Sequence, residues 1–171
     1  MVRKWLPGEL KEELEKIEII IDSREQANSH ITNFFDQKNV PYKVRKLDSG
    51  DYSATIGNLT LEHDVVIERK NSITELCGNM GQNRTRFENE FNRIKASGTK
   101  PFLLIENNTI DDVFIGNYRS QFKPKSLMAS IYTWMVRYNV TVLFCKPENT
   151  GKLIYGIMYY YARELLETDG K

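Results

Sequence analysis

The chain has 171 residues, of which 40% are hydrophobic and 27% are charged, and its formal net charge is +1. This length indicates one globular domain that can bury about 70% of its unfolded surface. A membrane-spanning helix is excluded because no run is apolar for roughly 18 residues, and the charge excludes an evenly basic nucleic-acid-binding chain. Cys77 and Cys145 lack metal-ligand spacing, so we expect reduced thiols. The protein is expected to be cytoplasmic, as in a bacterium or phage, or nuclear if eukaryotic.

Hydrophobic periodicity predicts strands that alternate with helices. In chain order, the prediction is helix 9–16, strand 17–22, helix 26–38, strand 42–47, and a hairpin of strands 52–56 and 59–62. Then come strand 64–70, helices 73–77 and 83–96, strand 102–106, a mobile loop over 107–122, helix 125–138, strand 140–145 and helix 150–167. We expect residues 1–16 to form a short helical extension and residues 17–171 to form the domain. The pattern predicts an α/β fold with a central mixed sheet covered by helices on both faces.

Three acids stand at the ends of predicted strands. Asp22 and Glu68 each follow a run of three apolar residues, and Asp51 follows a glycine that lets the backbone bend sharply. Carboxylates at the ends of buried strands suit Mg²⁺ or Mn²⁺, which prefer hard oxygen ligands and keep waters for substrate phosphates. The pattern therefore predicts a divalent-metal site with Asp22, Asp51 and Glu68 as ligands, and hydrolysis of a phosphodiester as its chemistry.

The basic residues beside these acids fit the same chemistry. Because side chains alternate along a strand, Glu68 and Lys70 project to one face and Arg69 to the other. Lys70 is thus placed to stabilise the charge that develops on a phosphate, or to orient the attacking water. Arg69 is expected to pair with a phosphate or with Glu25, and Arg24 joins the candidate catalytic residues.

Each of these motifs also has a simpler interpretation. Asp22 and the following Ser23 are residue types that commonly cap a helix, and Glu68-Arg69-Lys70 alone is a common solvated triplet. His30 and His63 are each isolated in the sequence, and we interpret both as surface or packing residues. The tyrosines of 155–161 are more typical of a core or an interface than of a base-stacking platform. The metal site is favoured because three acids and a lysine occur together.

The motifs resemble the nuclease domain of the XPF family of structure-specific DNA endonucleases, within the PD-(D/E)xK superfamily. The resemblance rests on Ile-Ile-Ile-Asp-Ser-Arg-Glu at 19–25, Gly-Asp-Tyr at 50–52 and Val-Ile-Glu-Arg-Lys at 66–70. It continues through 82–87, 101–106 and 124–127 and covers roughly 17–166. It implies a restriction-endonuclease-like fold and a metal-dependent endonuclease that cuts flaps, forks or junctions in repair or recombination.

Two departures from the family pattern matter. The family commonly places an Asp four residues after the motif lysine, where this chain has Thr74 followed by Glu75. Either Glu75 takes over the role of that acid or the role is dispensable. Family members usually carry a helix-hairpin-helix module after the nuclease domain, and we expect none in this chain. Junction selectivity would then come from dimerisation, from the loop 107–122 or from an accessory protein.

The predicted partners are DNA and a second copy of the chain. Arg84, Arg86, Lys123 and Lys125 are expected to contact DNA phosphates. The resemblance implies dimerisation through the helices at 125–138 and 150–167, whose apolar residues exceed what one helix face buries. Two alternatives stay open, namely a non-catalytic DNA-binding scaffold subunit and a nuclease without junction preference. The conjunction of repelling carboxylates with a lysine favours an enzyme, because such carboxylates cost stability without a metal.

Overall fold

The structure is a computed structural model, and it describes residues 5–82 and 84–168. Its strands are β1 (Ile17–Asp22), β2 (Tyr42–Arg45), β3 (Tyr52–Ile56), β4 (Leu59–Thr60), β5 (Val65–Lys70), β6 (Lys100–Glu106) and β7 (Thr141–Cys145). Its helices are α1 (Pro7–Leu14), α2 (Ser29–Lys38), α3 (Ile73–Gln82), α4 (Arg84–Ser97), α5 (Ile110–Ile115), α6 (Pro124–Tyr138) and α7 (Pro147–Thr168). None of these described helices is both long and apolar enough to cross a membrane.

The strands form one mixed sheet in the order β2-β1-β3-β5-β6-β7, with β4 paired to β3. Strand β1 runs parallel to β2, and β5, β6 and β7 run parallel to one another. Strand β3 lies between these two parallel groups and is antiparallel to both β1 and β5. The predicted mixed sheet is therefore confirmed.

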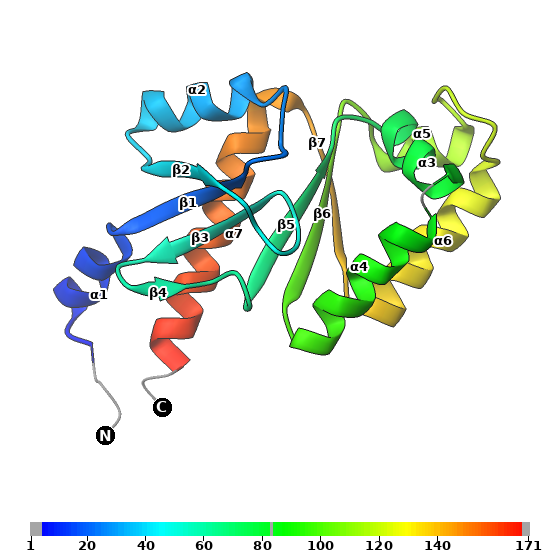
Figure 1. The fold of residues 1–171 in the computed structure, drawn as a ribbon. Helices are drawn as coiled ribbons and strands as arrows, with labels where there is room; N and C mark the ends of the chain where they lie inside the picture. Colours follow the sequence, from blue (N-terminus) through cyan, green and yellow to red (C-terminus); the bar gives the residue numbers. More distant parts are fainter. Residues whose placement is uncertain (1–4, 83, 169–171) are drawn as a thin grey trace.

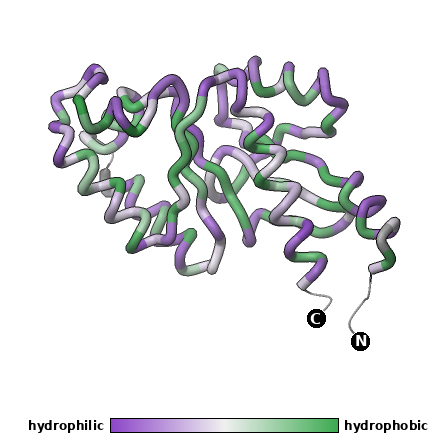
Figure 2. Tube along the Cα trace, turned by 180° about the vertical axis from the view of Figure 1, so that it is seen from behind, coloured by the Kyte–Doolittle hydropathy of each residue, from purple (hydrophilic) through white to green (hydrophobic). Residues whose placement is uncertain are grey.

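Helices cover both faces of the sheet, as predicted (Figure 1). On one face, α1, α2 and α7 pack over a core that includes Ile19, Ile21 and Ile67. On the other face, α3 to α6 pack over a core that includes Val66 and Leu103. Figure 2 shows the hydrophobic stretches running along the strands between these two layers. Successive residues of a buried strand thus enter different cores, and any polar residue among them is committed to one face.

Several bounds differ from the sequence prediction, since α3 continues to Gln82 and strands β2 and β4 end at Arg45 and Thr60. Two further segments differ in their structure. Helix α2 begins at Ser29 with Asn28 as its N-cap residue, so the residues after Asp22 are irregular and the helix-cap interpretation of that motif is wrong. The predicted mobile loop contains α5, whose first turn is closed by a reciprocal capping box between Thr109 and Asp112. The helix ends at Gly116, which has a positive φ of 74°. These local signals outweigh the polar composition of the segment.

The packing of α7 on α2 generates a test of the fold. A Cβ added to Gly151 would lie 2.8 Å from Cδ1 and 2.9 Å from Cβ and Cγ of Phe34, whereas one added to Gly156 would meet no atom within 4 Å. Overpacking costs about 1–3 kcal/mol, and alanine in a helix gains up to about 1 kcal/mol over glycine. We expect Gly151→Ala to lower the free energy of unfolding and Gly156→Ala to raise it in chemical denaturation. An equal gain in both variants would contradict this packing.

Candidate active site

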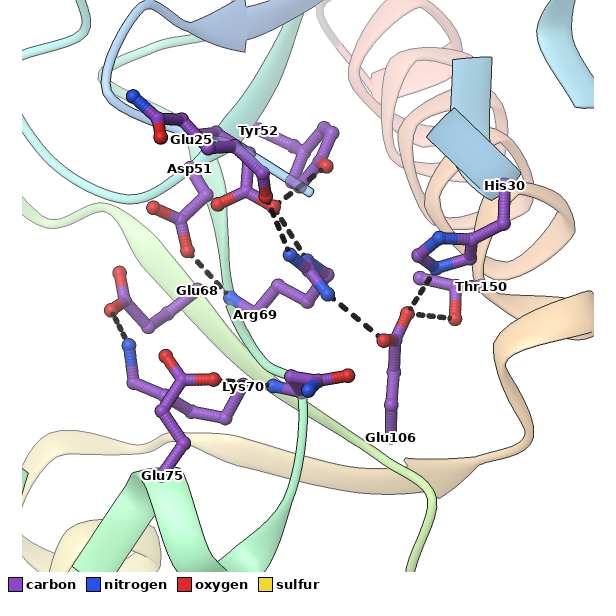
Figure 3. Close-up of polar contacts among 12 residues, drawn as sticks. Glu25, His30, Asp51, Tyr52, Glu68, Arg69, Lys70, Glu75, Glu106 and Thr150 are labelled. Carbon is purple, nitrogen blue, oxygen red and sulfur yellow. Dashed lines mark hydrogen bonds and ion pairs between the residues drawn. The ribbon is translucent and has the colours of Figure 1, made fainter. Parts of the chain in front are cut away.

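The charged residues at the end of strand β5 point to opposite faces of the sheet. Val66 belongs to the core under α3 to α6, and Ile67 belongs to the core under α1, α2 and α7. Alternation therefore places Glu68 and Lys70 on the α4 side of the sheet and Arg69 on the α2 side. Figure 3 shows Lys70 reaching toward Glu68 while Arg69 extends toward Glu106. The sequence prediction of opposite faces is borne out by this packing.

Asp51 is held against β5 by its own backbone and side chain. Its amide donates to the Ile67 carbonyl at 2.8 Å, and its Oδ2 accepts the Arg69 amide at 2.7 Å. The preceding Gly50 has a positive φ of 71°, and a Cβ there would lie 3.0 Å from Cβ of Val66. Only glycine fits this close approach without strain. The loop before β3 therefore fixes the Asp51 carboxyl beside the end of β5.

Glu68 and Lys70 lie in a small pocket between β5 and α4. Lys70 Nζ donates to Glu68 Oε1 at 2.5 Å and lies 5.8 Å from the centre of the Phe87 ring. The pocket has a volume of about 200 Å³, and it is lined by Glu68, Lys70, Asn79, Arg86, Phe87 and Glu90. We call it the β5–α4 pocket. It is large enough for solvent and opens beside the charged end of β5.

The pKa values of the two carboxyls and of Lys70 are shifted by burial and by their mutual charges. Burial and the neighbouring Glu68 carboxylate raise the pKa of Asp51 well above its usual value. Burial also raises the pKa of Glu68, with Lys70 opposing the change and Glu90 adding to it. For Lys70, burial alone would lower the pKa, but the carboxylates of Glu68 and Asp51 raise it overall. Two carboxyls that resist ionisation beside one ammonium would be stabilised by a further cation.

The donor set of Asp51 and Glu68 fits a hard divalent cation. Mg²⁺ commonly binds one or two protein carboxylates and completes its shell with water and substrate phosphate oxygens. Within the described residues, no group of three or more His, Cys, Asp or Glu side chains is arranged to hold a metal ion. Of the three acids predicted as metal ligands, Asp51 and Glu68 lie close enough that, besides burial, the charge of Glu68 raises the pKa of Asp51.

Asp22 lies at the end of β1, where its carboxylate is already satisfied by protein groups. Its Oδ1 accepts from the Arg24 amide at 2.8 Å and from Arg24 Nε at 2.7 Å, and its Oδ2 accepts the Leu47 amide at 2.6 Å. Burial would raise the pKa of Asp22, but hydrogen bonds from Arg24 and Leu47 lower it overall. This arrangement ties β1 to the loop before β3 and favours a positioning role for Asp22 and Arg24 over direct metal binding.

Arg69 forms the centre of a buried ionic network on the other face. Its Nε contacts Glu25 Oε1 at 2.5 Å, its Nη1 contacts Glu106 Oε2 at 2.9 Å, and its Nη2 donates to the Gln26 carbonyl at 3.1 Å. Tyr52 adds a hydrogen bond from its hydroxyl to Glu25 at 3.1 Å. The expected pairing of Arg69 with Glu25 is present. Arg69 is buried and Glu25 is half-buried, so their ion pair orients β5 and the segment after β1.

Three members of this network were not recognised as site residues in the sequence. Glu106 Oε1 accepts a 2.5 Å hydrogen bond from Thr150 and lies 2.7 Å from His30 Nε2. Burial would raise the pKa of Glu106, but the hydrogen bonds from Thr150 and His30 and the charge of Arg69 lower it overall. The available signal was that Glu106 ends a buried strand, as Asp22 does. His30, interpreted as a surface or packing residue, contributes to this buried network.

Glu90 is a further acid that the sequence did not single out. Its Oε1 accepts the Gly50 amide at 3.1 Å, and its side chain lines the β5–α4 pocket. Glu90 therefore links α4 to the glycine that positions Asp51. A usable sequence signal was its place four residues after Arg86, which puts both side chains on one helix face.

Thr74, at the position of the missing family Asp, and the adjacent Glu75 have different contacts. Thr74 Oγ1 accepts the Arg119 amide at 3.1 Å and so joins α3 to the segment before α6. Glu75 Oε2 accepts the Asn71 amide at 2.8 Å. Glu75 also acts on Lys70, adding to the effect of Glu68 and Asp51 on its pKa. This favours Glu75 as the residue that acts near the active site.

The predicted DNA-contacting residues lie in different places. Arg86 lines the β5–α4 pocket. Lys123 and Lys125 are exposed at the beginning of α6 and line neither this pocket nor the larger one beside it. The side chain of Arg84 lies outside the described part of the structure. The four residues remain predicted phosphate contacts, and of the three whose side chains are described, Arg86 lies at the site.

The raised pKa of Asp51 predicts a gain in stability when its charge is removed. Asparagine at position 51 keeps an oxygen that can accept the Arg69 amide. Above the unfolded carboxyl pKa of about 3.9, ionisation of Asp51 costs the folded state, and this cost disappears below that pH. Asp51→Asn should therefore melt at a higher temperature than the wild type at pH 7 without metal. At pH 3 the two proteins should melt at the same temperature.

The matched measurement is the same thermal melt with Mg²⁺ or Mn²⁺. These ions should raise the melting temperature of the wild type and leave that of Asp51→Asn nearly unchanged. A shift of about 2–4 °C per kcal/mol is expected for a domain of this size. An equal response of both proteins to the ions would contradict Asp51 as a ligand.

Comparison with known proteins identifies the family. A family model described as the ERCC4 domain matches residues 21–157. The structure of XPF from Aeropyrum pernix matches with a TM-score of 0.65 at 18% identity, covering 88% of this chain and 68% of that chain. XPF from Aeropyrum pernix in complex with DNA matches with a TM-score of 0.62 at 18% identity, covering 88% of this chain and 66% of that chain. No curated protein sequence gives a significant match. Because the family model spans most of its length, the chain belongs to the ERCC4-domain family, which confirms its resemblance to the XPF nuclease domain.

Proposed function

We propose that the protein is a divalent-metal-dependent DNA endonuclease with Asp51, Glu68 and Lys70 as its catalytic residues. The observation that carries the proposal is the pair of half-buried carboxyls of Asp51 and Glu68 beside the buried Lys70 ammonium, which contacts Glu68. The pKa values of both carboxyls are raised. Ionisable groups with strongly perturbed pKa values are concentrated at functional sites. Asp22 and Glu106 are stabilised as carboxylates by their protein partners, so a structural role accounts for them. Asp51 and Glu68 are not stabilised in this way.

Each residue has a defined role in phosphodiester hydrolysis. A bound Mg²⁺ or Mn²⁺ ion supplies activation of the attacking water and neutralisation of phosphate charge. Asp51 and Glu68 would hold that ion, and Lys70 would stabilise the negative charge that develops on the phosphate. Asp22, Arg24 and Arg69 keep the strands that carry these groups in register.

The proposed substrate is branched DNA, cut during repair or recombination. Membership of the ERCC4-domain family supports a nuclease function, and one similar structure is of XPF in complex with DNA. Preference for flaps, forks or junctions is inferred from the family resemblance. The active-site residues by themselves account for cleavage of a phosphodiester and do not distinguish these shapes.

Replacement of the three catalytic residues should abolish cleavage and leave DNA binding intact. We expect Asp51→Ala, Glu68→Ala and Lys70→Ala each to lose on the order of 10²-fold or more in rate, since each removes a charge that acts on the transition state. Binding should persist or tighten in the two carboxylate variants, because repulsion of phosphate is removed. Lys38→Ala, an exposed substitution on α2, serves as the control. Wild-type cleavage by any of the three variants would contradict the assignment.

A panel of labelled DNAs with Mg²⁺, Mn²⁺ or EDTA tests the substrate. Flap, fork and four-way DNAs should be cut faster than linear duplex, and EDTA should stop all cutting. Equal cutting of linear and branched DNA would favour a nuclease without junction preference. Binding without any cutting would favour a non-catalytic scaffold subunit.

We also infer that two copies associate through their C-terminal helices. Exposed apolar side chains occur on both helices, namely Tyr132, Met135 and Val136 of α6 and Tyr160 of α7. Strand β7 lies at the edge of the sheet beside these helices, and all its residues are partly exposed. Apolar surface of this kind commonly marks an interface. A homodimer would also supply a larger surface for branched DNA.

Sedimentation of two matched variants tests this interface. Val136 is 87% exposed on α6, and Val44 is 62% exposed on β2 at the opposite edge of the sheet. We expect Val136→Glu to shift the protein toward monomer at micromolar concentration, because a charge would be buried in the interface. Val44→Glu should sediment as the wild type does. A wild type that is monomeric while cutting junctions efficiently would contradict an obligatory dimer.

A further inference from the structure

A second polar pocket lies between α4 and the loop before β3. Its volume is about 690 Å³, and it is lined by Arg24, Lys46, Leu47, Asp48, Thr85, Arg86, Asn89 and Arg93. We call it the basic pocket. Four of its lining residues are cationic and one is acidic, so its walls carry a strong excess of positive charge. Among the described residues, no aromatic side chain lines the pocket, so it is not built for base stacking.

The positive charge of the basic pocket is largely uncompensated. Within the described part of the chain, the side chains of Lys46, Arg86 and Arg93 form no ion pair. Other cations near the site are paired, such as Arg45 with Glu62 and Lys70 with Glu68. Clustered like charges raise the local potential and attract an anion. The pocket is therefore arranged for a ligand that brings negative charge.

The basic pocket adjoins the proposed catalytic site. Arg86 lines both the basic pocket and the β5–α4 pocket that contains Glu68 and Lys70. Arg24 also lines the basic pocket, where its guanidinium binds the Asp22 carboxylate and the Leu47 carbonyl. The charges of Glu90 and Asp51 add to the effect of Asp22 in raising the pKa of Arg24. An anion in the basic pocket would thus lie beside the catalytic residues. A polyanion could occupy both pockets at once.

We propose that the basic pocket binds a backbone phosphate of the strand that is cut, next to the scissile phosphate, through Lys46 and Arg93. The proposal rests on the endonuclease function and adds a substrate subsite to it. The cations of the pocket suit a phosphate group. Because Arg86 lines both pockets, a phosphate within the same DNA strand is the favoured ligand. Such a contact positions the strand without reading its sequence. Its role is to set which phosphate reaches Asp51 and Glu68.

Binding across a salt series tests the charge contribution. The variant Lys46→Met/Arg93→Met removes two charges and keeps most of each aliphatic side chain. The control Lys11→Met/Lys38→Met removes two exposed charges from α1 and α2 on the other side of the sheet. Both are made with Asp51→Asn and measured in EDTA on a flap DNA, with thermal melts to check folding.

We expect the pocket variant to bind more weakly and to lose about one unit from the slope of log K against log salt. The control should keep the slope of the parent. Equal slopes in the pocket variant and the control would overturn the proposal. Because no cutting is needed, this result is independent of whether the protein is a nuclease.

A phosphate-by-phosphate replacement locates the contact. Single neutral methylphosphonates are placed at successive positions on each side of the branch point, on DNA with and without a terminal phosphate. One internal position should weaken binding of the parent protein and have no further effect on the pocket variant, as expected for two groups in contact. Additive losses at every position, or an effect confined to the terminal phosphate, would overturn the proposal. If that position is found but wild-type protein cuts no DNA, the subsite stands and the nuclease function fails.

Discussion

The structure depends on the attachment of the loop before β3 to strand β5. Strand β3 is the link between the two parallel groups of strands, and its register with β5 joins Tyr52 to Ile67. The backbone and carboxylate of Asp51 extend this short link by hydrogen bonds to the carbonyl of Ile67 and the amide of Arg69. The bonds that complete the sheet are therefore also those that place the Asp51 carboxyl beside Glu68. A substitution that weakens these hydrogen bonds should therefore lower the stability of the fold and displace the Asp51 carboxyl.

Charge is treated in opposite ways on the two faces of β5. Behind the strand, Arg69 is enclosed by Glu25 and Glu106, so that burial is offset by ion pairs and hydrogen bonds. A buried ion pair is weak evidence for net stability, and its evident effect here is to fix the direction of Arg69 and hence the rotation of the strand. In front, Lys70 pairs with Glu68, but burial and the repulsion between carboxylates leave Glu68 and Asp51 with raised pKa values. The paired charges on the rear face thus support a front face where the proposed metal ligands Glu68 and Asp51 have raised pKa values.

Features that depend on residues close in the sequence could be predicted from it, whereas contacts between distant segments could not. Alternation along β5 predicted the opposite directions of Glu68 and Arg69, and hydrophobic periodicity predicted the mixed sheet. The state of Asp22 was not predictable, because the Leu47 amide that it accepts becomes its neighbour only when β2 pairs with β1. Glu90 reaches Gly50 from a helix 40 residues later in the chain. Helix α5 was missed for a different reason. Its capping residues are visible in the sequence, but the prediction of a loop relied on the polar composition of the segment.

The net charge of +1 conceals a separation that suits a nuclease. Several acids are buried or paired within the protein, as Asp22, Glu25 and Glu106 are, and their charge is largely cancelled before it reaches the surface. Lys46, Arg86 and Arg93 of the basic pocket are exposed and form no ion pair with any described residue, and they lie beside the pocket that contains Glu68. A polyanion approaching this side would encounter positive charge first and the carboxyl pair only within the site. Because such local fields govern binding more than the net charge does, a nearly neutral chain can still direct a DNA strand to its active site.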